Sequence, residues 1–371
     1  MPRVRDVLDV PYWNVRTGPR NSISDVPGVL VGHVTLIEGS GPLIPGRGPV
    51  RTGVTVVLPH SGNIYREKVI AAAHVINGFT KAVGLVQVEE LGLIETPIAL
   101  TNTLNVGIVA DGLIEYSIRQ SPEIGISAPT VNPVVLECND GYLNDIQGRH
   151  VKQYHVLKAV EEASESFSEG SVGAGTGTIA FGFKGGIGTS SREVTTSFGT
   201  YVVGVLVQTN FGRTEDLVIA GVPVGKYLTG VQRSGSSGSV NVVVATNAPL
   251  TPRQLKRLAR RAQSGLARVG GYVYHGSGEV VLAFTTAFRV RTGVRELVNL
   301  EVLPDEELNS LFKGVVEATE EAVLNSMFNS TTMDGRDGRV VPGIPVEKIA
   351  ELVRGFWGYH SSKNSLKSSK P

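Results

Sequence analysis

The sequence predicts a layered α/β fold in a single domain. Its 371 residues, 41% of them hydrophobic and 19% charged, are enough to bury a large core. Short β-branched runs typical of buried strands alternate with amphipathic segments along the chain. We find no internal repeat and no linker between domains. Strands and helices that mix in this way are typical of packed helix and sheet layers.

The strand predictions rest on runs of Val, Ile and Leu that are bounded by turn residues. The two strongest runs are YVVGVLVQ at 201–208 and SVNVVVAT at 239–246. The predicted strands span residues 29–36, 53–59, 96–101, 133–137, 201–208, 239–246 and 279–285.

The helix predictions rest on apolar residues at helical spacing and on start signals. Pro252 opens one helix and Pro304 precedes another, whereas three alanines at 71–73 indicate a helix over 67–75. The predicted helices span residues 67–75, 104–118, 155–166, 251–268, 305–327 and 346–356. The polar tail 361–371 is predicted to be disordered.

Charge and cysteine content exclude several classes of protein. Lys and Arg number 35 against 34 Asp and Glu, so there is no electrostatic reason to expect a nucleic acid or an anionic membrane as partner. Cys138 is the single cysteine, which excludes an internal disulfide and a cysteine metal cluster. We see no signal-peptide core and no apolar run near the roughly 18 residues of a membrane span. The expected location is cytoplasmic.

Glycine is abundant, with 45 residues, and part of it clusters over 173–188. A phosphate loop is not supported, because Lys184 precedes the glycines and no Gly-Lys-Ser/Thr follows. The dinucleotide spacing fails as well. The seven histidines form no H-E-x-x-H or H-x-H pair, and no G-x-S-x-G is present. The sequence therefore predicts no cofactor and no metal.

A Ser- and Gly-rich segment, 234–239, runs directly into the apolar strand at Val240. Its simplest interpretation is a flexible loop. The alternative is chemical: if the Ser239 hydroxyl lies against the Gly238 carbonyl, an N-to-O acyl shift and hydrolysis cut the chain there. The freed α-amine can then act as general base for its own hydroxyl. Ser239 is favoured over Ser236 because only Ser239 adjoins the strand.

Several segments together resemble a known family over about residues 21–342. These are ISDVPGVLVGHVT (23–35), TNTLNVG (101–107), VNPVVLECNDGYLND (131–145), VGAGTGT (172–178), FKGGIGTSSR (183–192), YVVGVLVQTNFG (201–212), GSVNVVVATNAPLTPRQLKRLARRA (238–262) and GSGEVVLAFTTA (276–287). The chain resembles the self-processing serine aminopeptidases of the L-aminopeptidase/D-alanyl-esterase-amidase and β-aminopeptidase type.

The resemblance implies a four-layer αββα sandwich similar to N-terminal-nucleophile hydrolases. It implies one catalytic domain, cut into residues 1–238 and 239–371 that stay together. The implied activity is hydrolysis of N-terminal residues from short peptides, amides or esters with a free amine, through an acyl-enzyme on Ser239. A homo-oligomer, such as a tetramer of cleaved pairs, is also implied.

The matching positions imply roles for individual residues. Ser239 falls on the nucleophile, Ser277 and Glu279 on the pair that contacts it, Asn210 on the oxyanion donor, and Glu137 and Asn139 on the substrate pocket. These roles agree with the chemistry, because amide hydrolysis needs a nucleophile, a base and an oxyanion donor. A carboxylate such as Glu137 is a natural partner for a free amine.

Two positions depart from common family patterns. Asn139 stands where some members carry tyrosine, which makes the chain similar to the β-aminopeptidase branch. Asn247 stands where many relatives carry aspartate.

Two alternative functions follow from the same segment. An ornithine-acetyltransferase-like acyltransferase also cuts itself but uses threonine, so Ser239 argues against it. An uncut, non-catalytic binding protein would use the glycine-rich segment only as a loop.

Overall fold

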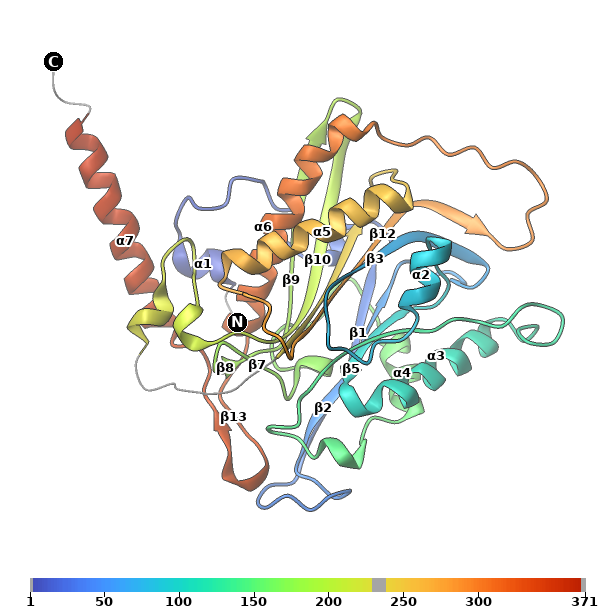
Figure 1. Ribbon diagram of the computed structural model, residues 1–371, viewed down its shortest axis with the longest axis horizontal. Coiled ribbons are helices and arrows are strands. Elements are labelled where there is room, and N and C mark those ends of the chain that lie inside the picture. Colours follow the sequence, from blue (N-terminus) through green and yellow to red (C-terminus); the bar gives the residue numbers. More distant parts are fainter. Residues whose placement is uncertain (1–2, 229–237, 368–371) are drawn as a thin grey trace.

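Two β-sheets lie face to face and each is covered by helices on its outer side, as Figure 1 shows for the computed structural model of the chain. The structure describes residues 3–228 and 238–367, with side chains through residue 358. The predicted segment 234–237 therefore lies outside the described residues. The arrangement is a four-layer αββα sandwich, which confirms the predicted fold class.

Each sheet combines segments that lie far apart in the chain. In spatial order, the four-stranded sheet consists of β1 (Leu30–Glu38), β2 (Val50–Leu58), β5 (Ile98–Asn102) and β6 (Val134–Cys138). The six-stranded sheet consists of β4 (Leu93–Ile94), β3 (Glu67–Gly78), β12 (Gly278–Arg291), β11 (Ser239–Thr246), β10 (Gly199–Asn210) and β9 (Ile187–Thr196). Two small ribbons pair β7 (Ile179–Ala180) with β8 (Phe183–Lys184) and β13 (Met333–Asp334) with β14 (Val340–Val341).

Helices form the two outer layers. They are α1 (Val4–Leu8), α2 (Leu85–Leu91), α3 (Val106–Gln120), α4 (Gln153–Glu161), α5 (Pro252–Arg268), α6 (Leu308–Phe328) and α7 (Val346–Lys367). The first and last helices, α1 and α7, pack against each other. Helices α5 and α6 pack on the six-stranded sheet, and α3 and α4 pack on the four-stranded sheet. Among the described residues, we find no helix with both the length and the apolar character needed to cross a membrane.

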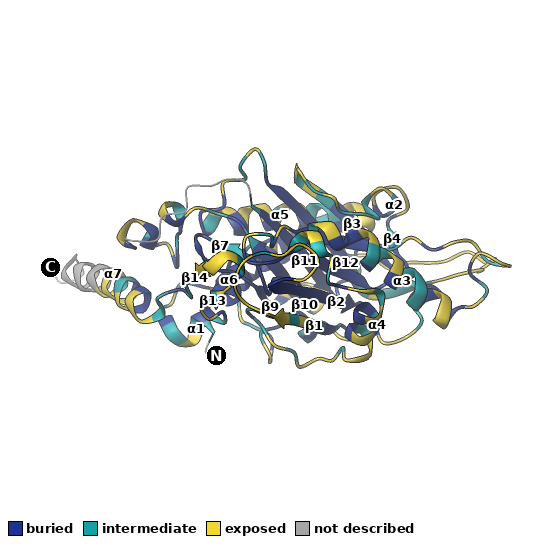
Figure 2. Ribbon diagram, turned by 90° about the horizontal axis from the view of Figure 1, so that it is seen from below, coloured by how far each residue is buried: buried dark blue, intermediate teal, exposed yellow. Residues whose placement is uncertain are grey.

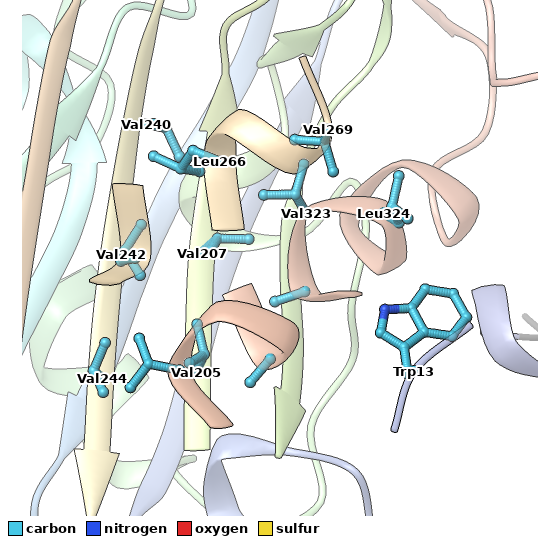
Figure 3. Close-up of a cluster of buried hydrophobic side chains, with 14 of the residues drawn as sticks. Trp13, Val205, Val207, Val240, Val242, Val244, Leu266, Val269, Val323 and Leu324 are labelled. Carbon is cyan, nitrogen blue, oxygen red and sulfur yellow. The ribbon is translucent and has the colours of Figure 1, made fainter. Parts of the chain in front are cut away.

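The alternation of side chains along β11 decides where its polar residues point. Val240, Val242 and Val244 face the helices α5 and α6, and Leu266 of α5 lies beside Val240 in Figure 3. Val243 and Ala245 belong to the other face and pack between the two sheets. Because side chains two apart share a face, Ser239 and Asn241 also point between the sheets.

Apolar side chains from both sheets fill the space between them. The group includes Val31, Val57, Leu100 and Leu136 from the four-stranded sheet, and Leu206, Val243, Leu282 and Phe284 from the six-stranded sheet. The strands are mostly buried in Figure 2, whereas exposed residues lie on the covering helices and loops. This core fixes the strand ends rigidly, which is what a site built on them requires.

The predicted helix over residues 67–75 is wrong, because this segment is the long strand β3. Its alanines alternate between the two apolar layers: Ala72 faces the α5 side, and Ala71 and Ala73 face the inter-sheet core. Small side chains suit a strand that packs closely on both faces. Tertiary packing therefore outweighs the helix propensity of alanine here.

Other element boundaries differ from the predictions for identifiable reasons. Helix α4 ends at Glu161 rather than 166, because Ser164 forms backbone hydrogen bonds in both directions with Val31 at the edge of β1. Strand β9 is not among the predicted strands, because its central residues, 189–193, are polar and give no apolar strand pattern. A side chain at Gly188 would lie 2.0 Å from the Ala322 carbonyl oxygen of α6. The final helix α7 continues to Lys367, into the segment 361–371 whose composition predicts disorder.

Candidate active site

Ser239 is the first residue of β11, an inner strand of the six-stranded sheet. It pairs with Asn210 at the end of the antiparallel strand β10 and with Gly278 at the start of the parallel strand β12. The backbone N–H of Gly278 donates to Ser239 Oγ at 3.3 Å. Ser239 is buried, with 8% of its surface exposed.

The position before Ser239 has no space for a side chain. A Cβ on Gly238 would lie 1.8 Å from the Asn210 carbonyl oxygen and 2.6 Å from Phe211 Cα. Contacts this short require the backbone to move. Position 238, which precedes the predicted nucleophile, therefore requires glycine for steric reasons.

Ser277 and Glu279 come from the turn and strand that follow on the other side of Ser239. Ser277 donates from Oγ and from its backbone N–H to the Tyr274 carbonyl oxygen, at 2.6 and 3.0 Å. Glu279 is 2% exposed, and burial raises the pKa of its carboxyl to about 7, although a hydrogen bond with Ser277 opposes the shift. Within the described residues, Glu279 Oε2 has no hydrogen-bond partner.

Asn210 lies directly across the strand pair from Ser239, a position that brings Cβ atoms to about 4.5–5.5 Å. Its amide is fixed at both ends. The Ile179 N–H donates to Oδ1 at 3.0 Å, and Nδ2 donates to the Asn139 carbonyl oxygen at 3.0 Å. An amide nitrogen carries two hydrogens, so one N–H of Asn210 is left to donate to a reacting group.

Glu137 lies near the end of β6 and is 2% exposed. Its Oε1 accepts hydrogen bonds from Thr80 Oγ1 at 3.1 Å and from the Lys81 N–H at 2.9 Å. Its Oε2 accepts a hydrogen bond from Thr103 Oγ1. Because a carboxylate offers about four acceptor positions, one position is left for a further donor.

Three successive residues tie the end of β6 to the nucleophile strand and its neighbour. Asn241 Nδ2 donates to the Glu137 carbonyl oxygen at 2.9 Å, and Cys138 Sγ contacts the Ser239 carbonyl oxygen at 3.4 Å. Asn210 makes the third link, to the carbonyl of Asn139. These bonds bring Glu137 and Ser239 to the same end of the space between the sheets.

Cys138 and Asn139 differ in what they offer to the site. Burial holds the pKa of Cys138 well above its usual value, so it is a thiol that acts as a weak donor inside the core. The Asn139 side chain is exposed, and its Oδ1 accepts a hydrogen bond from the Gly141 N–H at 2.9 Å. The Asn139 side chain is therefore not among the buried groups of the site.

Sequence reasoning missed several residues that hold the site together. Thr80 and Thr103 orient Glu137, and Asn77 Nδ2 donates to the carbonyl oxygens of Ser277 and Tyr274 at 2.6 and 3.0 Å. Thr103 lies inside the segment TNTLNVG that carries the resemblance, which is a signal for its importance but not for its partner. Thr80 and Asn77 show no distinctive pattern.

A metal-dependent arrangement is not formed by these side chains. Across residues 3–228 and 238–358, we find no group of three or more His, Cys, Asp or Glu side chains that could hold a metal ion. The site instead offers a hydroxyl, a fixed amide donor and two buried carboxyls. A serine that begins an inner strand between two helix-covered sheets is the arrangement of an N-terminal-nucleophile hydrolase.

The chain belongs to peptidase family S58, whose sequence model matches residues 21–341. It is 40% identical to beta-peptidyl aminopeptidase BapA of Sphingosinicella microcystinivorans, over 96% of this chain and 92% of that protein. The expected resemblance is thereby confirmed.

Solved structures agree with this assignment. A protein of Pyrococcus horikoshii OT3 is 53% identical with a TM-score of 0.92, covering 96% of this chain and 99% of that one. The L-aminopeptidase D-Ala-esterase/amidase of Ochrobactrum anthropi, a serine aminopeptidase with a variant N-terminal-nucleophile hydrolase fold, is 38% identical with a TM-score of 0.90, again covering 96% and 99%. The protein is a serine aminopeptidase of this family.

Proposed function

We propose that the protein cuts itself between Gly238 and Ser239 and then removes N-terminal residues from short peptides, amides or esters. The observation that carries the proposal is the position of Ser239. It begins an inner strand, its hydroxyl lies beside the N–H of Gly278, and it faces the fixed amide of Asn210. The preceding position accepts only glycine without a backbone shift.

Self-cleavage needs no group from outside the chain except water. Ser239 Oγ attacks the carbonyl carbon of Gly238, the peptide C–N bond breaks, and the proton that the hydroxyl loses ends on the nitrogen of Ser239. The ester that results is hydrolysed by water. The products are a carboxylate on Gly238 and a free α-amine on Ser239.

The two halves have extensive contacts that can hold them together. Strands β11 and β12, from residues 239–371, lie between β3 and β10, from residues 1–238. Helix α6 adds a buried ion pair, since Arg192 Nη2 of β9 lies 2.6 Å from Glu321 Oε2. Separation of the halves would break the central sheet and expose its core.

Hydrolysis then follows from the same atoms. The freed amine takes the Ser239 hydroxyl proton while Oγ attacks the substrate carbonyl, and an N–H of Asn210 donates to the oxyanion. The amine returns the proton to the leaving nitrogen, which leaves an acyl ester on Ser239. The amine then takes a proton from water, which attacks this ester; the bond between the acyl carbon and Ser239 Oγ breaks, the acid leaves, and Oγ takes the proton back from the amine. Ser277 and Glu279 tune the amine from the side of β12.

The buried carboxylate of Glu137 supports selection of a free amine on the substrate. Three donors orient it, and its fourth acceptor position suits an ammonium group. Asn139 lines the entrance. The relatives include a beta-peptidyl aminopeptidase and an L-aminopeptidase with D-Ala-esterase/amidase activity, so we propose amino-acyl amides with α- or β-amines as substrates.

The test compares wild type with Ser239→Ala on a panel of L-, D- and β-amino-acyl amides, each with and without an N-acetyl group. We expect wild type to hydrolyse only compounds with a free amine and the variant to be inactive. Hydrolysis by Ser239→Ala would contradict the proposal. Adding a second amine as acceptor tests the acyltransferase alternative, because transfer in excess of hydrolysis would favour it.

We further propose a homo-oligomer that works in the cytoplasm. The segment between β12 and α6 supports an interface, since it exposes apolar side chains, among them Leu297 at 97% exposure. Light scattering on the cleaved protein tests the assembly, and cell fractionation tests the location. A monomeric mass would contradict the proposed assembly, and recovery of the protein outside the cytoplasm would contradict the proposed location.

A further inference from the structure

Lys184 in β8 is a buried charge that the mechanism above does not use. Its exposed fraction is 0%, and Nζ donates to the carbonyl oxygens of Gly175, Thr178 and Gly185 at 2.9, 2.8 and 2.7 Å. Three acceptors at these distances use all three hydrogens of an ammonium group. Fully buried lysines are rare unless their charge is compensated, so this one needs an explanation.

The Thr178 carbonyl connects Lys184 to the active site. The same peptide group that accepts from Lys184 at its oxygen donates, through the Ile179 N–H, to Asn210 Oδ1 at 3.0 Å. In a planar trans peptide the C=O and N–H point in opposite directions. One peptide group therefore lies between the ammonium of Lys184 and the amide of Asn210.

The electrostatic consequence is directional. A cation at the carbonyl end polarises the peptide group, which makes its N–H a stronger donor. That donor in turn polarises the Asn210 amide and strengthens the free Nδ2–H. Such effects are larger in a buried site than in water. We propose that Lys184 is a positioning residue that strengthens Asn210 as the oxyanion donor through the Thr178–Ile179 peptide, an inference that rests on the proposed function.

Asp140 is an acidic group whose charge acts on this cation. It is buried, its Oδ1 accepts from Asn144 Nδ2 at 2.9 Å, and burial raises its pKa to about 7. Burial lowers the pKa of Lys184 to about 7, and the charge of Asp140 opposes that shift. The three carbonyl acceptors match the three hydrogens of the ammonium form, and in that form the charge lies against the Thr178 carbonyl.

A purely structural role for Lys184 makes a different prediction. If the ammonium only closes the glycine-rich turn, its loss disturbs the site whether or not Asn210 is present. If it acts through Asn210, its loss matters only while Asn210 is there. A double-mutant cycle separates the two roles.

The experiment uses Lys184→Met and Lys184→Gln, each alone and combined with Asn210→Ala, on protein shown by mass to be fully cut. Glutamine retains two N–H donors without the charge, so it preserves part of the turn. Lys68→Met is the matched control, because Lys68 Nζ also binds a carbonyl, that of Tyr65 at 3.1 Å, at the opposite end of β3 from the site.

We expect each Lys184 variant to lower kcat about tenfold with little change in KM, since loss of a whole oxyanion donor costs roughly 100- to 1,000-fold. In the Asn210→Ala background the further loss of kcat should be under about twofold, because the amide through which Lys184 acts is already absent. Lys68→Met should have wild-type kinetics.

Equal losses in both backgrounds, or no loss with Asn210 present, would overturn the inference. Failure of both Lys184 variants to fold and cut themselves would also overturn the inference, because the role of the Lys184 ammonium would then be to stabilise the fold. Full activity of Asn210→Ala would instead contradict the proposed function, so the two failures are distinguishable.

Discussion

Replacing Thr103 by valine tests how Glu137 is held for a substrate amine. Thr103 Oγ1 is the donor to Oε2 of this carboxylate, whereas Thr80 and the Lys81 N–H both bind Oε1. Valine has nearly the same shape as threonine but no hydroxyl. The substitution therefore leaves Oε2 without its donor and allows the carboxylate to turn away from the pocket.

The size of the effect follows from the bond that is lost. A hydrogen bond to a charged group contributes about 1.5–3 kcal/mol, and about 1.4 kcal/mol corresponds to tenfold in an equilibrium or rate constant. We expect KM for amino-acyl amides to rise by roughly tenfold or more, because the amine contact is made before the reaction. The kcat value should change by less than about twofold.

The assay is steady-state hydrolysis of an amino-acyl p-nitroanilide by fully cut protein. Thr103→Ser keeps the hydroxyl and should restore KM to within about threefold of wild type, since the donor is present again. Unchanged KM in Thr103→Val would refute the reasoning. So would an equal defect in Thr103→Ser, because the shape of the side chain would then matter rather than its hydroxyl.

Three further predictions concern maturation, pH and stability. Gly238→Ala should slow self-cleavage strongly, since its Cβ would lie 1.8 Å from a carbonyl oxygen. Gel electrophoresis of samples taken over time measures the rate of cleavage, and cleavage at the wild-type rate would contradict the prediction. Burial raises the pKa of Glu279 to about 7, so its carboxylate, which supports the protonated amine in the transition state, forms as pH rises, and kcat/KM should rise through pH 7. Glu279→Gln should leave only the rise that deprotonation of the Ser239 amine produces, at about pH 8, whereas an unchanged profile would argue against the assignment. Arg192→Met should lower the free energy of unfolding by about 3–5 kcal/mol, because it removes the ion pair of buried Glu317 and leaves buried Glu321 paired only with Arg5 among the described cations. A melting temperature within 1–2 °C of wild type would contradict this prediction.

Local signals explain where sequence reasoning succeeds. Strand β11 has the predicted bounds because Val242, Val243, Val244 and Ala245 form a continuous apolar run, as is typical of a strand buried on both faces. Helix α5 begins where expected because Thr251 and Gln254 form a capping box around Pro252. Strand β3 was missed because packing on both faces, not local propensity, decides its structure.

The residues of the site likewise divide into those that the sequence predicts and those that only the structure shows. Ser239, Asn210 and Glu279 could be proposed because each lies in a segment with a recognisable pattern. The order of segments does not show which side chains meet, however. The donors to Glu137 come from Thr80 and Lys81, which follow β3, and from Thr103, which begins a short 3-10 helix after β5, and all three lie far from Glu137 in the chain. Lys184 belonged to a failed phosphate-loop pattern, and only its carbonyl partners show what its charge contacts.

The mass of the chain after expression tests the central claim most directly. Purified protein is denatured and its intact mass is measured, with Ser239→Ala treated in parallel. We predict two masses, for residues 1–238 and 239–371, in wild type and a single mass for residues 1–371 in the variant. A single full-length mass in wild type that persists through prolonged incubation would contradict the account, because Ser239 would then have no free amine to act as its base.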